Sequence, residues 1–168
     1  MSEPIINKVS ESGLITLDLE EHYPKEEVLE FDIKPLLFKE LILKEKEFRL
    51  SLQQFDWQKY KDRVVAVNCS ADAVIPVWAY MLIATYLQPV AKEIILGDKE
   101  AAKKQLFLKQ INEIDGNLYL DKRIIIKGCG ELPIGEYAYM EITKKLRPFA
   151  KSIMYGEPCS TVPVYKKK

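Results

Sequence analysis

Three cysteines are the residues whose type and surroundings most directly indicate chemistry. Cys69, Cys129 and Cys159 stand in the strings NCS, GCG and PCS, among small and turn-forming neighbours. An inert cysteine usually fills the apolar body of a strand or helix. The loop-like neighbours therefore favour a shared functional site, with unrelated buried thiols as the alternative.

Three thiolates in one site are typical of a bound metal, either zinc with one further ligand or iron, including an iron–sulfur cluster. Asp72 and Glu131 are the preferred candidates for the fourth ligand, and Glu157 and His22 are the other candidates. Asp72 is also a candidate helix N-cap, and a single histidine among polar residues is more often a surface residue. An open fourth position would mark a catalytic or transfer site.

Two other kinds of function stay open at this point. Cys69 and Cys129 each precede a predicted helix, and a helix N-terminus stabilises a thiolate. They could therefore serve a thiol-dependent enzyme or a redox sensor, although no C-x-x-C motif is present. The remaining alternative is a metal-free interaction domain with inert thiols. Whether any reaction is catalysed stays undecided.

The elements that must position these cysteines alternate between β-branched runs and helical patterns. We predict strands near residues 63–69, 92–97, 117–129 and 152–156, with helices near 74–87, 98–114 and 135–151 between them. Such alternation is typical of an α/β fold, here a three-layer sandwich with a mostly parallel sheet. Each cysteine then follows a strand, at the edge where open α/β sheets bind ligands.

The first part of the chain is harder to interpret. Residues 14–19 alternate as an edge strand would, and a helix is expected around residues 44–55. We predict an N-terminal α+β extension, residues 1–40, packed on an α/β domain of residues 41–168. No internal repeat is evident along the chain.

Composition excludes several classes of function. Twenty-five basic residues balance twenty-five acidic ones, so no overall charge draws the chain to nucleic acid or to a membrane surface. The N-terminus lacks the pattern of a secretory signal, which predicts a cytoplasmic protein with reduced thiols. Residues 73–91 carry no charge but contain two prolines, and we expect a buried helix there in preference to a membrane span. Motifs for binding phosphate are absent.

Three strings together resemble a known family: LKEKEFRLSLQQFDWQKYKDRVVAVNCSADAVIPVWAYMLIA, KGCGELPIGEYAYMEITKKLRP and YGEPCSTVPVYKK. They are similar to a family of uncharacterised bacterial proteins, a domain-of-unknown-function family centred on the Bacteroidetes, over most of the chain from about Leu41. The resemblance implies no activity. It implies genes beside those of the Suf iron–sulfur assembly machinery, hence an accessory role in metal or cluster handling with assembly proteins as partners. This favours metal binding over thiol chemistry alone.

Overall fold

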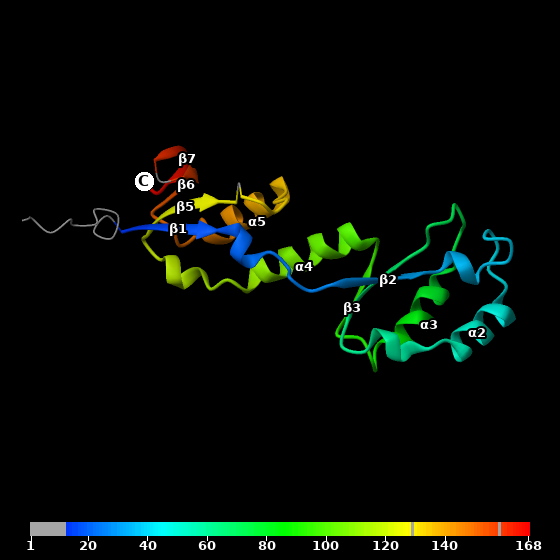
Figure 1. Cartoon of the computed structure of the whole chain (residues 1–168). Coiled ribbons are helices and arrows are strands. Elements are labelled where there is room, and N and C mark those ends of the chain that lie inside the picture. Colours follow the sequence, from blue (N-terminus) through cyan, green and yellow to red (C-terminus); the bar gives the residue numbers. More distant parts are fainter. Residues whose placement is uncertain (1–12, 129, 158) are drawn as a thin grey trace, which may run out of the picture. The chain divides into compact units, whose positions relative to one another are not determined.

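The computed structural model describes residues 13–128, 130–157 and 159–168 (Figure 1). The chain forms two compact units: Lys25–Leu106, here the inserted unit, and Met1–Pro24 with Phe107–Lys168, here the split unit. In chain order the elements are β1 (Leu14–Asp18), β2 (Val28–Asp32), α2 (Glu45–Gln54), β3 (Val64–Asn68), α3 (Val77–Leu87), β4 (Glu93–Leu96), α4 (Lys99–Glu113), β5 (Arg123–Lys127), α5 (Glu136–Leu146), β6 (Ser152–Glu157) and β7 (Ser160–Lys166).

The inserted unit holds a parallel sheet in the order β2-β3-β4. On one face, Val65 and Val67 of β3 pack in a cluster with buried residues of α2 and α3. On the other face, Val64 and Ala66 pack in a cluster with Ala102 and Leu106 of α4. Because β3 is apolar on both faces, as a central parallel strand must be, helices cover both sides. The expected three-layer α/β arrangement is confirmed here.

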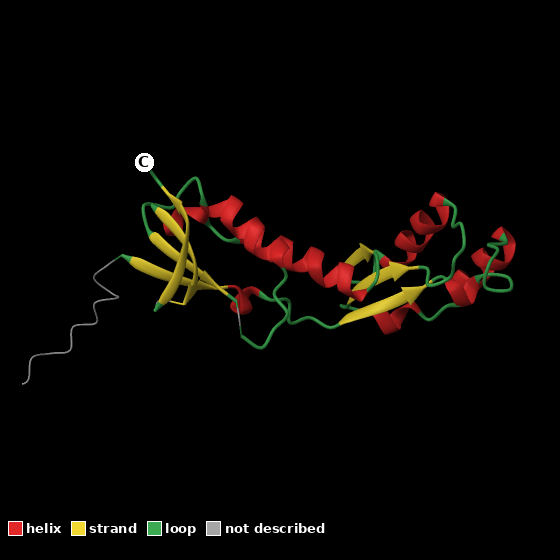
Figure 2. Cartoon of the chain, turned by 90° about the horizontal axis from the view of Figure 1, so that it is seen from above, coloured by secondary structure: helices red, strands yellow, loops and turns green. Residues whose placement is uncertain are grey.

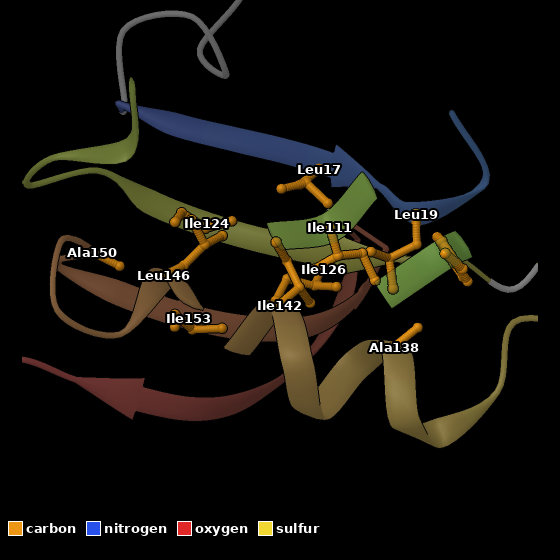
Figure 3. Packing of buried hydrophobic residues seen from close by; sticks show 11 residues of the cluster. Leu17, Leu19, Ile111, Ile124, Ile126, Ala138, Ile142, Leu146, Ala150 and Ile153 are labelled. Carbon is orange, nitrogen blue, oxygen red and sulfur yellow. The ribbon is translucent and has the colours of Figure 1, made fainter. Parts of the chain in front are cut away.

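The split unit holds a second sheet in the order β1-β5-β6-β7, in which β7 alone is antiparallel (Figure 2). Its core lies between this sheet and α5 together with the C-terminal half of α4, as Figure 3 shows. The side chains that meet there include Leu17, Ile124, Ile126 and Ile153 from the strands and Ile111, Ala138, Ile142 and Leu146 from the helices. Figure 3 thus shows side chains of the strands and of the helices in a single apolar interior in this unit.

The mostly parallel α/β fold is confirmed, but its strands form two sheets where a single sheet was expected. The edge strand at residues 14–19 and the helix at residues 44–55 are also confirmed, as β1 and α2. The expected boundary at residue 40 coincides with neither limit of a unit. Instead, residues 1–40 supply one edge strand to each sheet, β1 beside β5 and β2 beside β3. Parallel pairing joins strands that are distant in sequence, so proximity along the chain misled the prediction.

The apolar segment at residues 73–91 forms α3, which begins only at Val77, with Pro76 as its N-cap. The proposed N-cap role of Asp72 is therefore wrong. The helix buries Ala79, Ile83 and Leu87 on one face, whereas Met81 on another face is 65% exposed. The expected burial on all sides is wrong as well. Within the described residues, no helix is both long and apolar enough to cross a membrane.

The two units are copies of one folding pattern, related by a constant sequence offset. Residues 59 positions apart hold the same places: β3 and β5, α3 and α5, β4 and β6. The buried residues of α3 and α5 agree one by one. Between Phe48 and Gly97, the identical pairs at this offset are Phe48 and Phe107, Asp56 and Asp115, Tyr60 and Tyr119, Asp62 and Asp121, Ile75 and Ile134, Ala79 and Ala138, Tyr80 and Tyr139, Met81 and Met140, Ile83 and Ile142, Leu87 and Leu146, Pro89 and Pro148, Ala91 and Ala150, Lys92 and Lys151, Ile94 and Ile153, and Gly97 and Gly156.

Backbone details repeat with the sequence. Gly97 directly follows β4 and has a φ of 133°, and Gly156, the last residue but one of β6, has a φ of 119°. Asp32 and Asp18, at the ends of the first strands, each accept a hydrogen bond at 3.0 Å from the backbone N–H two residues later. The expectation that the chain contains no repeat is therefore wrong. In the sequence, the inserted unit lies between β1 and the C-terminal half of α4, which both belong to the split unit. The strand β1 is therefore far in sequence from the remainder of the split unit.

The copies diverge directly after the positive-φ glycine. In the inserted unit, Asp98 accepts a hydrogen bond from Ala101 N at 2.8 Å and begins α4. In the split unit, the chain turns back after Glu157 and adds β7 to the sheet. Helix-forming Lys, Glu and Ala follow Asp98, whereas Ser, Thr and Val precede Pro163 in β7. The C-terminal residues thus form an edge strand, where proline is tolerated.

Candidate functional site

The carboxyl edge of the split unit's sheet carries two of the three cysteines. β5 ends at Lys127, two residues before Cys129, which lies outside the described residues. β6 ends at Glu157, and Cys159 lies exposed in the turn before β7. β5 and β6 are parallel neighbours, so their carboxyl ends meet at one edge, which is the usual ligand-binding edge of such sheets. Figure 1 shows β5 and β6 side by side.

Three carboxylates surround one ammonium group at this edge. Lys127 Nζ lies 3.1 Å from Asp18 Oδ2. The hydrogen bond to Asp18 and its charge raise the pKa of Lys127, and the charges of Glu157 and Glu20 raise it further. Acidic side chains from β1, β6 and the 3₁₀ turn after β1 therefore converge on the end of β5. Such a cluster attracts cations to this edge.

The side chain of Glu20 also positions the loop that follows β5. Its Oε1 accepts a hydrogen bond from Leu132 N at 2.9 Å. The same carboxylate lies so close to Gly130 that a Cβ there would overlap it. A side chain at residue 130 would therefore displace the Glu20 carboxylate, which ties the loop to the turn after β1. Glu131 is exposed on this loop.

A cavity of about 540 Å³ opens beside the loop, within the size range of small-molecule sites. Its polar and aromatic lining includes Glu136, Tyr139 and Tyr155. Gly128 borders it, and a Cβ at Gly128 would lie 2.7 Å from the Tyr139 hydroxyl. A second, apolar cavity of about 540 Å³ shares both tyrosines and extends over α5 and β7. The two rings meet edge to face with centroids 5.6 Å apart.

Cys69 occupies the corresponding edge of the inserted unit. It is half-buried against the core of that unit, and its Sγ donates to Ala71 O at 3.7 Å. Burial raises the pKa of the Tyr80 hydroxyl, and the charge of Cys69 raises it further. In the split unit, Gly128 is the equivalent of Cys69 and Tyr139 is the equivalent of Tyr80. The split unit therefore has a glycine at the position where the inserted unit has a cysteine.

The structure assigns the predicted metal ligands to different units. Cys69 and Asp72 belong to the inserted unit, whereas Cys159 and Glu131 belong to the split unit. His22 also belongs to the split unit, at the end of the 3₁₀ turn after β1. Among the residues that the structure describes, no group of three or more His, Cys, Asp or Glu side chains could hold a metal ion. The shared three-cysteine site stays a prediction.

Sequence reasoning missed the residues that shape the edge. Asp18 ends β1 and Glu20 lies in the 3₁₀ turn that follows, both far from β5 in sequence, and only the parallel pairing of β1 with β5 brings them to the end of β5. A local signal was present in the string DLEE, residues 18–21. An aspartate such as Asp18, followed by acidic residues in the first turn, is typical of a helix N-cap. Tyr139 lies in a helix that covers the sheet, where aromatic residues are usually core residues, so its position in the sequence does not indicate that it lines a cavity.

Residues 3–167 match the model of a family described as "Protein of unknown function (DUF2480)". Neither the curated proteins nor the solved structures include a significant match to the chain.

Proposed function

The chain belongs to this family of unknown function, and we propose that it is a metal-binding protein whose site lies at the carboxyl edge of the split unit's sheet. The observation that carries the proposal is the position of Cys159 and of the loop through Gly128 and Gly130 at the ends of the neighbouring parallel strands β6 and β5. Cys129 and Cys159 would supply thiolates, and Glu131, on the same loop as Cys129, would supply a carboxylate.

Thiolates with one carboxylate suit zinc or iron, and iron–sulfur clusters are held by thiolates in the same way. The charges of Asp18, Glu20 and Glu157 that raise the pKa of Lys127 would also stabilise a bound cation. Three protein ligands would leave a coordination position open, as in catalytic and transfer sites. The cavity beside the loop would give access to that position.

Cys69 and Asp72 were predicted as further ligands, and we propose to test them separately because they belong to the other unit. The duplication makes this comparison informative. Cys69 follows the central strand of the inserted unit, as Cys129 follows that of the split unit, with a shift of one position in the alignment of the copies. A Cys69→Ser variant is therefore a matched control for Cys129→Ser.

The biological role that we propose is accessory to iron–sulfur cluster assembly or metal homeostasis in the cytoplasm, with assembly proteins as partners. Two considerations support it. A reducing compartment keeps exposed thiols such as Cys159 available as ligands. The gene neighbourhood implied by the family resemblance points to the same process.

The test is metal content and the visible absorption spectrum of protein purified without oxygen. We expect near-stoichiometric zinc or iron in the wild type and in Cys69→Ser, and its loss in the Cys129→Ser/Cys159→Ser double variant. Loss of metal in Cys69→Ser alone would show that the site includes the inserted unit. Folded wild type that stays metal-free after anaerobic reconstitution with iron, sulfide or zinc would overturn the proposal, and selective alkylation of one cysteine would then support the thiol-based alternative.

A further inference from the structure

The two copies differ in what covers the outer edge of their third strand. In the split unit, β7 pairs antiparallel with β6 along this edge, from Ser152 with Lys166 to Glu157 with Ser160. In the inserted unit, the equivalent strand β4 pairs with β3, and no further strand joins it within the described residues. The same edge is thus covered in one copy and open in the other.

Backbone hydrogen-bonding groups face that open edge. Gly97 N donates to Val67 O at 2.9 Å, which directs its N–H toward β3. Successive residues of a strand alternate in direction, so the N–H and C=O groups of Ile94 and Leu96 are directed away from β3. An open row of such groups is a template for another strand.

Apolar side chains border the same edge. Leu96 is 69% exposed and Met81 is 65% exposed. Their equivalents in the split unit, Tyr155 and Met140, line one cavity together with Val164 of β7. The equivalence places Leu96 and Met81 on the same face of the inserted unit, beside the strand edge to which no further strand is added among the described residues.

Val77, at the start of α3, extends this apolar surface and is 76% exposed. Its equivalent in the split unit is the charged residue Glu136. The inserted unit, in which the strand edge is open, is thus more apolar at this position. The split unit, in which β7 covers the equivalent edge, is more polar. This difference is expected if the open edge is buried against another molecule.

We propose that this edge binds a second copy of the chain, with β4 of the two copies antiparallel about a twofold axis. The β6–β7 pair shows that an antiparallel neighbour fits this edge, and a twofold axis makes two identical strands antiparallel. A four-residue strand offers few hydrogen bonds to an isolated peptide, whereas a second copy also buries the apolar side chains of α3. The net charge of zero does not oppose self-association.

The test is the oligomeric state of the full chain by sedimentation velocity and light scattering over a range of concentrations. We expect a wild-type dimer whose dissociation constant rises at least about tenfold in the Met81→Lys/Leu96→Lys variant, since charges would face each other across the axis. The matched control is Met140→Lys, at the equivalent and similarly exposed position of the split unit, which should leave the dimer unchanged. Circular dichroism would confirm that each variant is folded.

Amide hydrogen exchange gives a second readout. The N–H groups of Ile94 and Leu96 should be protected in the wild type at high concentration and should exchange faster in the double variant. A wild type that is monomeric at all concentrations overturns the proposal. So does a dimer that the double variant leaves intact, or one in which these two amides exchange freely. Neither readout depends on bound metal, so failure here is distinct from failure of the proposed function.

Discussion

Asp62 and Asp121 hold the same left-handed backbone conformation in the two copies, with φ of 57° and 54°. The N–H of Asp62 donates to Val90 O, in the turn before β4, at 2.9 Å. The N–H of Asp121 donates to Phe149 O, in the turn before β6, at the same distance. These bonds join the turn that precedes the central strand to the turn that precedes the third strand. The register of both sheets is therefore supported by a turn geometry that few residues adopt readily.

Substituting Val for either aspartate should destabilise the protein by a similar amount. A left-handed conformation costs about 1–2 kcal/mol for a residue with a Cβ, and Asp is among the residues that tolerate it best. We expect Asp62→Val and Asp121→Val each to lower the free energy of unfolding by about 1–2 kcal/mol, as measured by urea denaturation. Asp→Asn at each position is the control and should change little. A clear loss at one position alone would contradict their equivalence.

The close approach of Gly128 to Tyr139 predicts that a second substitution, at Tyr139, recovers stability lost by a substitution at Gly128. A Cβ at residue 128 would lie 2.7 Å from the tyrosine hydroxyl, so Gly128→Ala should destabilise the protein by about 1–3 kcal/mol through overpacking. Removing the hydroxyl with Tyr139→Phe should recover part of that loss in the double variant. A double-mutant cycle in urea measures this coupling. Strictly additive effects would show that the clash is relieved in another way.

The Asp32 carboxylate predicts a pH dependence. Although burial raises its pKa, hydrogen bonds from the Ser70 hydroxyl and from the N–H groups of Ser70 and Lys34 outweigh this effect and lower it overall. A carboxyl whose folded pKa is depressed stabilises the fold above its unfolded pKa of about 3.9, and this contribution is lost as pH falls through the folded pKa. Ser70→Ala should raise the pKa of Asp32 and reduce the loss of stability at acid pH. Carboxyl titration by NMR would measure the shift, and an unchanged pKa would contradict this assignment.

Equivalent core positions should be equally sensitive to truncation. Ile83 of α3 and Ile142 of α5 are both fully buried, and an Ile→Ala change at such a site costs about 2–5 kcal/mol. We expect each variant to weaken amide protection chiefly in its own unit, as measured by hydrogen exchange. Met81→Ala is the exposed control on α3 and should cost much less. Equal loss of protection throughout the chain would show that the two units unfold together.

Local pattern was sufficient for most of the elements. The runs that became β3 and β5 are β-branched and apolar on both faces, which few structures other than a central parallel strand accommodate. Asp98 directly precedes the helix-forming residues of α4 and accepts a hydrogen bond from Ala101 N, as an N-cap aspartate does. By contrast, β2 has an ordinary mixed composition, and β7 contains a proline. Their strand conformation comes from pairing with β3 and β6, and no local signal predicted it.

Some features of the candidate site could likewise be predicted from local sequence, and others depend on the pairing of distant strands. Local sequence indicated that Cys129 and Cys159 follow strands, because glycine, proline and serine mark the turns beside them. It did not indicate that Asp18 and Glu20 would meet Lys127, since that contact depends on β1 pairing with a strand more than a hundred residues away. It also placed Cys69 in one site with the other two cysteines, whereas Cys69 belongs to the second unit.

By itself, the sequence determined the class of the fold, most helices and central strands, and the positions of the cysteines after strands, because these follow from short-range periodicity and turn chemistry. Only the tertiary structure showed that the strands form two sheets, that one copy interrupts the other, and that one copy ends in a strand where the other continues into a helix. These features depend on which distant strands pair. Pairing is decided by the free energy of burying whole faces together, and no local segment contains that information.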